Sequence, residues 1–154
     1  MTDEANLKTI ESLRRAYCME METVANYLAI SIDLDGVRAE EIKKSLQADI
    51  TEELGHAQRL GQRIKQLGGL VPGSLDLKFG QKELQPPEDT TDVVGVIRGV
   101  IAVENQAIAH YKQIIRDTDG WDYVTQDLCI QLLSQEEAHR VMFAGFLKEY
   151  EKGE

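Results

Sequence analysis

The sequence predicts an all-α protein, a bundle of four long helices with one long crossover between the second and the third. Four stretches of about 25 to 30 residues repeat their apolar side chains at helical spacing. Two short glycine-containing turns and one long connection separate these stretches. The chain has 154 residues with only 12 glycines and 3 prolines, which suits a single helix-rich domain over residues 1–154.

Composition narrows the classes of partner. The formal net charge of -10 would repel phosphate backbones, so we expect no nucleic-acid binding. The longest apolar run, residues 93–103, is interrupted by Arg98 and is too short to span a membrane. No signal peptide is evident, and Cys18 and Cys129 are too isolated for a disulfide framework, so we expect buried thiols and a cytoplasmic protein.

The first helix is expected from about Asp3 to Asp33 and the second from about Arg38 to Leu67. Gly36 supplies the turn between them, and Gly68 stands where the second helix should end. Because the turn is so short, the two helices should be antiparallel neighbours.

The connection of residues 69–89 holds all three prolines and has no sustained helical period, apart from a short helical turn expected at Gln81–Leu84. A helix of about 30 residues is ~45 Å long, whereas about 20 extended residues can span ~65 Å. The connection can therefore run the length of the bundle, so that the third helix starts at the end where the second began.

The third helix should open near Thr90–Asp92 and continue to about Arg116, and the fourth should run from about Trp121 to Tyr150. Gly95 and Gly99 predict a close helix contact, within the chain or between subunits.

A repeated motif lies inside this pattern. Glu53 and His56 are three residues apart, and so are Glu136 and His139. A pair at this spacing projects from one helix face, so both side chains can reach one metal ion. Upstream, Glu20 lies 33 residues before Glu53, and Glu104 lies 32 before Glu136; a tyrosine follows each seven residues later. The chain thus contains two copies of one half-site.

All four glutamates fall near the middle of their helices, so they should meet in one layer of the bundle core. Burying each carboxylate costs several kcal/mol, and a domain is stable by only about 5–15 kcal/mol. Two divalent cations would balance four negative charges, and two neutral imidazoles would complete the coordination. The alternative is a buried network without metal, in which partly protonated carboxylates hydrogen-bond to the histidines.

Four oxygen donors, two imidazoles and no thiolate favour iron or manganese, although zinc could occupy the site in a purified sample. Tyr27 and Tyr111 could hydrogen-bond the ligands, pass an electron to them or serve only as amphipathic core residues. His110 lies off the inward face and is expected at the surface or at a subunit contact.

With these motifs the sequence resembles the bacterioferritin branch of the ferritin-like di-iron carboxylate superfamily, over all four helices. The segment Asp122–Asp127 leading into Glu136 is especially similar. The resemblance implies that Glu20, Glu53, His56, Glu104, Glu136 and His139 bind two iron ions and are the catalytic residues, with Glu53 and Glu136 bridging. It also implies a ferroxidase that oxidises Fe(II) with O2 or H2O2 and stores or detoxifies iron as a homo-oligomer.

The sequence departs from that family in three places. Leu54 stands where haem-binding members have methionine, so we expect no haem. Only fifteen residues follow His139, so no fifth helix is evident, and a dimer or a dodecameric shell is open beside a cage of twenty-four subunits. The long connection is also slightly longer than in the family.

Two other functions remain open. The first is a non-storing di-iron or di-manganese oxidase or peroxidase, rubrerythrin-like, in a small oligomer. Against it, Ala107 replaces a further carboxylate of rubrerythrins, and their paired Cys-x-x-Cys module is missing. The second is a helical interaction protein that keeps a metal-binding core for stability alone.

Overall fold

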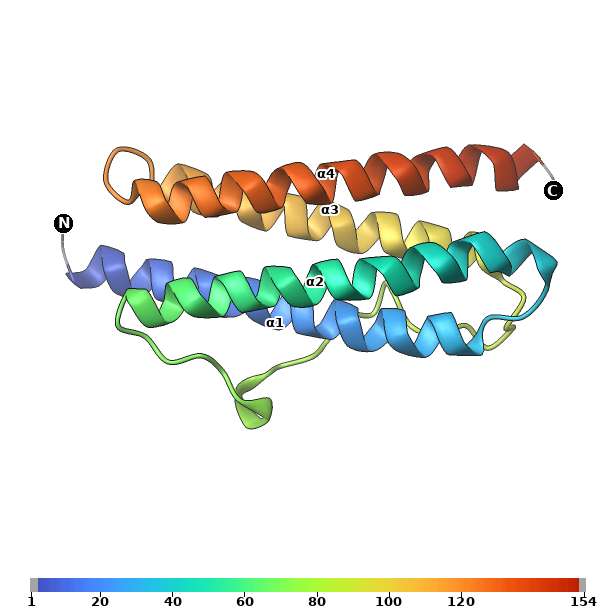
Figure 1. Ribbon diagram of the computed structural model, residues 1–154, viewed down its shortest axis with the longest axis horizontal. Helices are drawn as coiled ribbons and strands as arrows, with labels where there is room; N and C mark the ends of the chain where they lie inside the picture. Colours follow the sequence, from blue (N-terminus) through green and yellow to red (C-terminus); the bar gives the residue numbers. More distant parts are fainter. Residues whose placement is uncertain (1–2, 153–154) are drawn as a thin grey trace.

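The computed structural model describes residues 3–152, and within this range it contains four long α-helices, two single-turn 3-10 helices and no strand. The helices lie lengthwise beside one another (Figure 1). The predicted all-α, four-helix class is confirmed. The bounds of the helices are α1 Asp3–Asp33, α2 Glu40–Gln66, α3 Val93–Asp117 and α4 Tyr123–Lys152.

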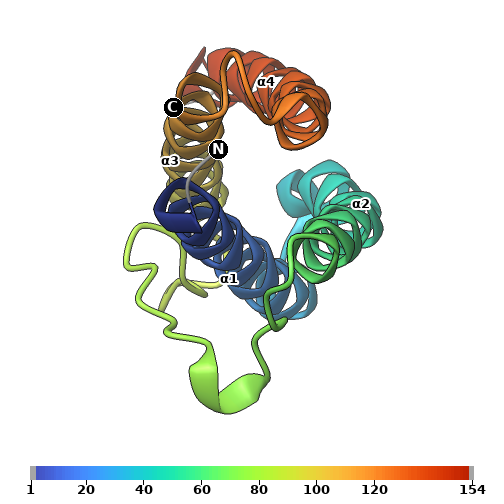
Figure 2. The same cartoon turned by 90° about the vertical axis from the view of Figure 1, so that its left-hand side faces the viewer.

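The helices form two antiparallel pairs, α1 with α2 and α3 with α4, which face each other across the bundle (Figure 2). Gly36 and Gly120 turn the chain within each pair at φ of 98° and 84°, a region that favours glycine. A 3-10 turn at Val37–Ala39 precedes α2, so this helix begins two residues later than expected.

The crossover runs along the outside of α1 and starts α3 at the end where α2 begins, as predicted (Figure 1). Its last residues are tied to the α1–α2 turn, because the Asp35 amide donates to the Thr90 carbonyl at 2.9 Å and the Thr90 hydroxyl donates to the Asp35 carboxylate at 2.6 Å. The helical turn expected at Gln81–Leu84 was wrong. The crossover forms its turn at Ser74–Asp76 instead.

Tertiary contacts explain that difference, because the segment around Gln81 is bound to α1. The Gln81 amide donates to the Glu22 carboxylate at 2.6 Å, and its side chain bonds Thr23 and Asn26. Leu84 is 1% exposed and belongs to the core. These anchors fix a bent backbone where isolated sequence preference allowed a helical turn.

Within the described chain, neither glycine makes the expected close contact with another helix, and a contact between subunits stays a prediction. A Cβ at Gly99 would lie 2.6 Å from the Glu83 carbonyl oxygen, so the close approach is to the crossover and not to another helix. Gly95 instead faces the side chain of Asp92, which caps α3 by accepting from the Gly95 amide at 2.9 Å. Asp122 caps α4 in the same way, accepting from the Thr125 amide at 3.1 Å.

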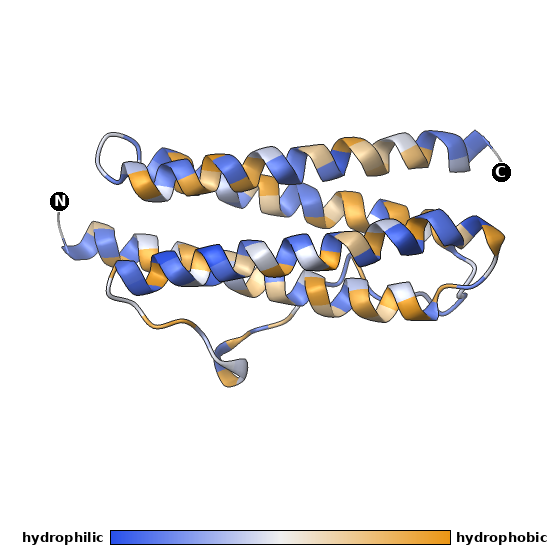
Figure 3. Ribbon diagram, viewed as in Figure 1, coloured by the Kyte–Doolittle hydropathy of each residue, from blue (hydrophilic) through white to orange (hydrophobic). Residues whose placement is uncertain are grey.

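The apolar core is divided into two clusters along the bundle. Hydrophobic and hydrophilic residues are interleaved along all four helices (Figure 3), as in amphipathic helices. On α1 one cluster contains Ile10 to Ala16 and the other Tyr27 to Leu34, so the position of Glu20 falls between them. Every helix crosses from one cluster to the other at its central glutamate. None of the helices in the described range has the length and hydropathy that a bilayer span needs.

Candidate metal centre

The structure brings all six predicted residues together between the two apolar clusters. Each of the four helices supplies one glutamate, and α2 and α4 each add a histidine one turn later. None of the six residues is more than 5% exposed. Their ligand atoms form two groups, each within 4.8 Å, that share Glu53 and Glu136. One group adds Glu20 and His56, here called the His56 half-site; the other adds Glu104 and His139, the His139 half-site.

The two shared glutamates each turn one oxygen toward each half-site. The Nδ1 atom of His56 lies 3.0 Å from Glu136 Oε1 and 3.8 Å from Glu53 Oε2. The Nδ1 atom of His139 lies 3.5 Å from Glu53 Oε1 and 3.8 Å from Glu136 Oε2. The outer glutamates complete the halves, with Glu20 3.4 Å from the His56 ring and Glu104 4.0 Å from the His139 ring. This arrangement suits two cations bridged by two carboxylates.

Unsatisfied polar atoms mark the same place. Among the described residues, seven buried side-chain atoms have no hydrogen-bond partner, and six of them come one each from the six predicted residues. Both histidine Nδ1 atoms are in this set. Buried polar atoms are almost always paired, so unpaired atoms that converge on one point are what a cation-binding site would present. The oxygen-rich donor set with two imidazoles fits two divalent ions of the iron or manganese type.

When no metal is bound, protons on the two histidines and on Glu104 compensate part of the buried negative charge. Burial lowers the pKa of both histidines, but the carboxylates of Glu136 and Glu53 outweigh it and raise the pKa of His56 to about 10 and that of His139 to about 12. Burial, followed by the neighbouring Glu136 carboxylate, raises the pKa of Glu104 well above its usual value. Bound cations would displace these protons.

The two tyrosines of the repeat bond the glutamates crosswise. Tyr27 on α1 donates to Glu104 on α3 at 2.9 Å, and Tyr111 on α3 donates to Glu20 on α1 at 2.7 Å. Of the roles that the sequence left open, the hydrogen bond to a predicted ligand is the one seen. The other oxygen of each glutamate, Oε2, is buried and has no hydrogen-bond partner.

Sequence reasoning missed a set of residues behind the histidines. The outer nitrogen, Nε2, of His139 lies 2.7 Å from Glu52 Oε2 and 3.5 Å from Asp49 Oδ1. The corresponding atom of His56 contacts the amide oxygen of Gln135. The repeat held a signal for two of them, because Glu52 and Gln135 each directly precede a shared glutamate.

A very small cavity borders the carboxylates. It has a volume of about 10 Å³ and is lined by Glu20, Glu53, Glu104 and Glu136 together with Thr23 and Gln81. Gln81 comes from the crossover and is 9% exposed, so the crossover covers this side of the centre. Its place there could not be read from a segment without helical period.

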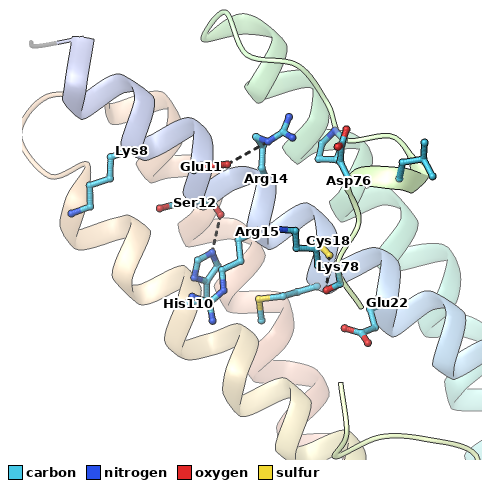
Figure 4. A pocket seen from close by; sticks show the side chains of 13 residues that line it. Lys8, Glu11, Ser12, Arg14, Arg15, Cys18, Glu22, Asp76, Lys78 and His110 are labelled. Carbon is cyan, nitrogen blue, oxygen red and sulfur yellow. Dashed lines mark hydrogen bonds and ion pairs between the residues drawn. The ribbon is translucent and has the colours of Figure 1, made fainter. Parts of the chain in front are cut away.

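A far larger cavity, of about 730 Å³, lies elsewhere, between α1, α3 and the crossover (Figure 4). None of the six predicted residues lines it. Its charged groups are of both signs, and Arg14 is already paired with Glu11 and the Leu70 carbonyl. His110 lies on its wall, half-buried and off the inward face as expected, with Nε2 2.8 Å from the Ser12 carbonyl.

The cysteines lie apart from the centre. Cys129 is buried in one apolar cluster, which raises the pKa of its thiol to about 12. Cys18 is only half-buried, on the wall of the large cavity, where its sulfur lies 3.6 Å from the Lys78 carbonyl oxygen. The expectation of two buried thiols therefore holds for Cys129 alone.

Known proteins share both sequence and fold with this chain. The DNA protection during starvation protein of Pyrococcus furiosus is 28% identical over 144 residues, which cover 91% of this chain and 77% of that protein. The bacterioferritin of Desulfovibrio desulfuricans is 25% identical over 138 residues, covering 89% of this chain and 73% of that protein.

Solved structures of related proteins have the same fold. The D. desulfuricans bacterioferritin, described with its diiron site in different catalytic states, matches with a TM-score of 0.84 at 23% identity, over 97% of this chain and 83% of its own. A dodecameric thioferritin, the bacterioferritin-related protein of Bacteroides fragilis, matches with a TM-score of 0.83 at 22% identity, over 96% and 88%. The family model of the ferritin-like domain matches residues 10–152, and the chain therefore belongs to the ferritin-like family, as a bacterioferritin-like member.

Proposed function

We propose that this protein is a ferroxidase that takes two Fe(II) ions as substrate at the six-residue centre. The observation that carries the proposal is the pair of shared carboxylates, because Glu53 and Glu136 each present one oxygen to each half-site. Two Fe(II) ions held side by side can together supply the two electrons that reduce O2 and two protons to H2O2, or H2O2 and two protons to two waters. Anionic oxygen donors favour the Fe(III) product.

The size of the cavity beside the carboxylates supports a small oxidant. A cavity of about 10 Å³ is at the lower limit for one water molecule. Sites for organic ligands usually offer about 300–1,000 Å³. The geometry therefore favours O2 or H2O2 over an organic substrate, and favours iron oxidation over the alternative of a di-iron or di-manganese oxidase with an organic substrate.

A homo-oligomer is part of the proposal. The related B. fragilis protein is described as dodecameric, and it covers nearly the same length of fold. The acidic chain, with a formal net charge of -10, gives no reason to add nucleic acid as a partner, and we propose none.

The activity is tested with two neighbouring glutamates on α4. Glu136→Gln removes a shared carboxylate charge with little change of shape, whereas Glu137→Gln removes the same charge from a side chain that is 44% exposed. We expect Glu136→Gln to slow aerobic Fe(II) oxidation at least a hundredfold, followed by absorbance of the ferric product, and Glu137→Gln to retain the wild-type rate. Equal rates in all three proteins would contradict a ferroxidase centre at this place.

Iron storage is tested by loading the protein with iron. Excess Fe(II) is added in air, and the protein peak from gel filtration is analysed for iron and for mass. We expect a large particle that retains far more than about two irons per chain. Two irons per chain in a small oligomer would be consistent with a ferroxidase but would refute iron storage. Wild-type protein that binds metal but does not turn over Fe(II) would indicate a purely structural centre.

A further inference from the structure

The two half-sites are built alike but are supported differently. In each half-site, Nδ1 of the histidine faces the centre and Nε2 faces a residue of the opposite helix. That residue directly precedes the shared glutamate of its helix: Glu52 behind His139, and Gln135 behind His56. The positions are equivalent in the repeat, but one is a carboxylate and the other is a neutral amide.

A second position increases the difference. Asp49, four residues before Glu53, is 7% exposed and has its Oδ1 atom 3.5 Å from His139 Nε2, with Oδ2 unpaired. The residue four before Glu136 is Leu132, which is fully buried. The His139 half-site therefore has two extra carboxylates behind its imidazole, and the His56 half-site has none there.

This difference acts on a bound cation in two ways. A carboxylate that accepts from the outer N–H of an imidazole fixes the ring orientation and makes the inner nitrogen a stronger donor, more so than a neutral amide oxygen does. The additional negative charge also attracts a cation directly, and more strongly where little water screens it. Both effects favour the same half-site.

We propose that the two metal positions are unequal, with the His139 half-site binding a divalent cation more tightly and filling first, and with Glu52 as the positioning residue that makes it so. This inference rests on the proposed dinuclear centre and names its order of filling. Glu52 need not bind the metal, since its oxygen lies on the far side of the His139 ring from the other ligands.

The test uses Co(II) without oxygen, so that binding is measured without turnover. Titration of the full-length protein, followed by calorimetry and by the visible spectrum of Co(II), should give two unequal steps, with a total of two ions per chain. Glu52→Gln should weaken the tighter step by about ten- to a hundredfold and leave the weaker step nearly unchanged, so that the two constants converge.

The reverse substitution at the equivalent position of the repeat is the matched variant. Gln135→Glu should strengthen the weaker step by about tenfold and leave the tighter step alone. Glu41→Gln on α2, whose side chain is 74% exposed, controls for the loss of one charge and should change neither constant. The metal-free melting temperatures of Glu52→Gln and Gln135→Glu report whether a variant has lost its fold instead.

The outcomes separate the two proposals. Two equal steps in the wild-type protein, or a Glu52→Gln variant that keeps its tighter step, would overturn the inference and leave the dinuclear centre standing. Loss of a third ion in Glu52→Gln would also overturn it, because Glu52 would then be a ligand of a separate site. Failure of the wild-type protein to bind two Co(II) ions would refute the proposed centre and the inference together.

Discussion

At the scale of single residues, the hydroxyls of Tyr27 and Tyr111 determine which way the outer glutamates face. Each tyrosine is fully or almost fully buried and bonds a glutamate from the other half of the repeat. Burial, above all, raises the pKa of both phenols well above 10, so they act as neutral donors at any physiological pH. One oxygen of each glutamate is thereby held, and the other is buried without a hydrogen-bond partner.

Removing one such hydroxyl should cost stability. Tyr27→Phe leaves a buried Glu104 oxygen without its donor, and we expect the free energy of unfolding to fall by about 1–3 kcal/mol. Tyr17→Phe is the control, because Tyr17 lies at the edge of one apolar cluster. Urea unfolding of the metal-free proteins measures both. A Tyr27→Phe variant as stable as Tyr17→Phe would mean that the crossed bond contributes nothing.

At the scale of elements, the part of the crossover from Gln81 to Leu84 is anchored to the bundle. Leu84 is buried in the core and Gln81 bonds three residues of α1, while the backbone at Glu83 closes onto Gly99. A glycine in the interior of α3 therefore serves contact with the crossover and not flexibility of the helix. The same contact holds Gln81 over the carboxylates.

Two helix-interior glycines test this contact. Gly99→Ala would place a methyl group 2.6 Å from the Glu83 carbonyl oxygen, whereas a methyl at Gly145 meets nothing within 4 Å. We expect Gly99→Ala to destabilise the protein by about 1–3 kcal/mol. Gly145→Ala should stabilise it by up to about 1 kcal/mol, since alanine favours helix. Thermal unfolding distinguishes them, and the same sign for both variants would argue against the proposed packing.

At the scale of the whole molecule, the centre joins two helix pairs. Contacts are extensive within α1–α2 and within α3–α4, and less extensive between the pairs. Each half-site takes ligand atoms from both pairs, since Glu53 and Glu136 belong to both groups. Bound cations would therefore fasten the two halves of the bundle to each other.

Cation binding should accordingly stabilise the fold. At a concentration one hundred times its Kd, a ligand that binds only the folded state adds about 2.7 kcal/mol, so we expect Co(II) to raise the melting temperature of the wild-type protein. The double variant Glu53→Gln with Glu136→Gln lacks both shared carboxylates and should show no rise. A rise of equal size in both proteins would place the stabilising cation elsewhere.

Much of the fold and of the candidate centre could be predicted from the spacing of residues along the sequence. Helical periodicity gave four helices with bounds within a few residues, because burial of one face is written into every turn of a helix. The repeat of Glu53-x-x-His56 at Glu136-x-x-His139, together with the upstream Glu20 and Glu104, singled out the six residues that the structure brings together. The path of Gln81 escaped prediction, because its partners Glu22 and Thr23 lie 59 and 58 residues away.

The sequence by itself determined the four helices, the long crossover and the central layer of four carboxylates and two imidazoles. The helices follow from apolar periodicity, the crossover from its prolines and lack of period, and the layer from the mid-helix position of each glutamate. Only the tertiary structure decided which oxygen faces which half-site, that each tyrosine bonds the opposite glutamate, and that Glu52 and Gln135 lie behind the histidines. The physical reason is that these relations join different helices. They depend on how far each helix is rotated against its neighbours, which packing of the two apolar clusters sets.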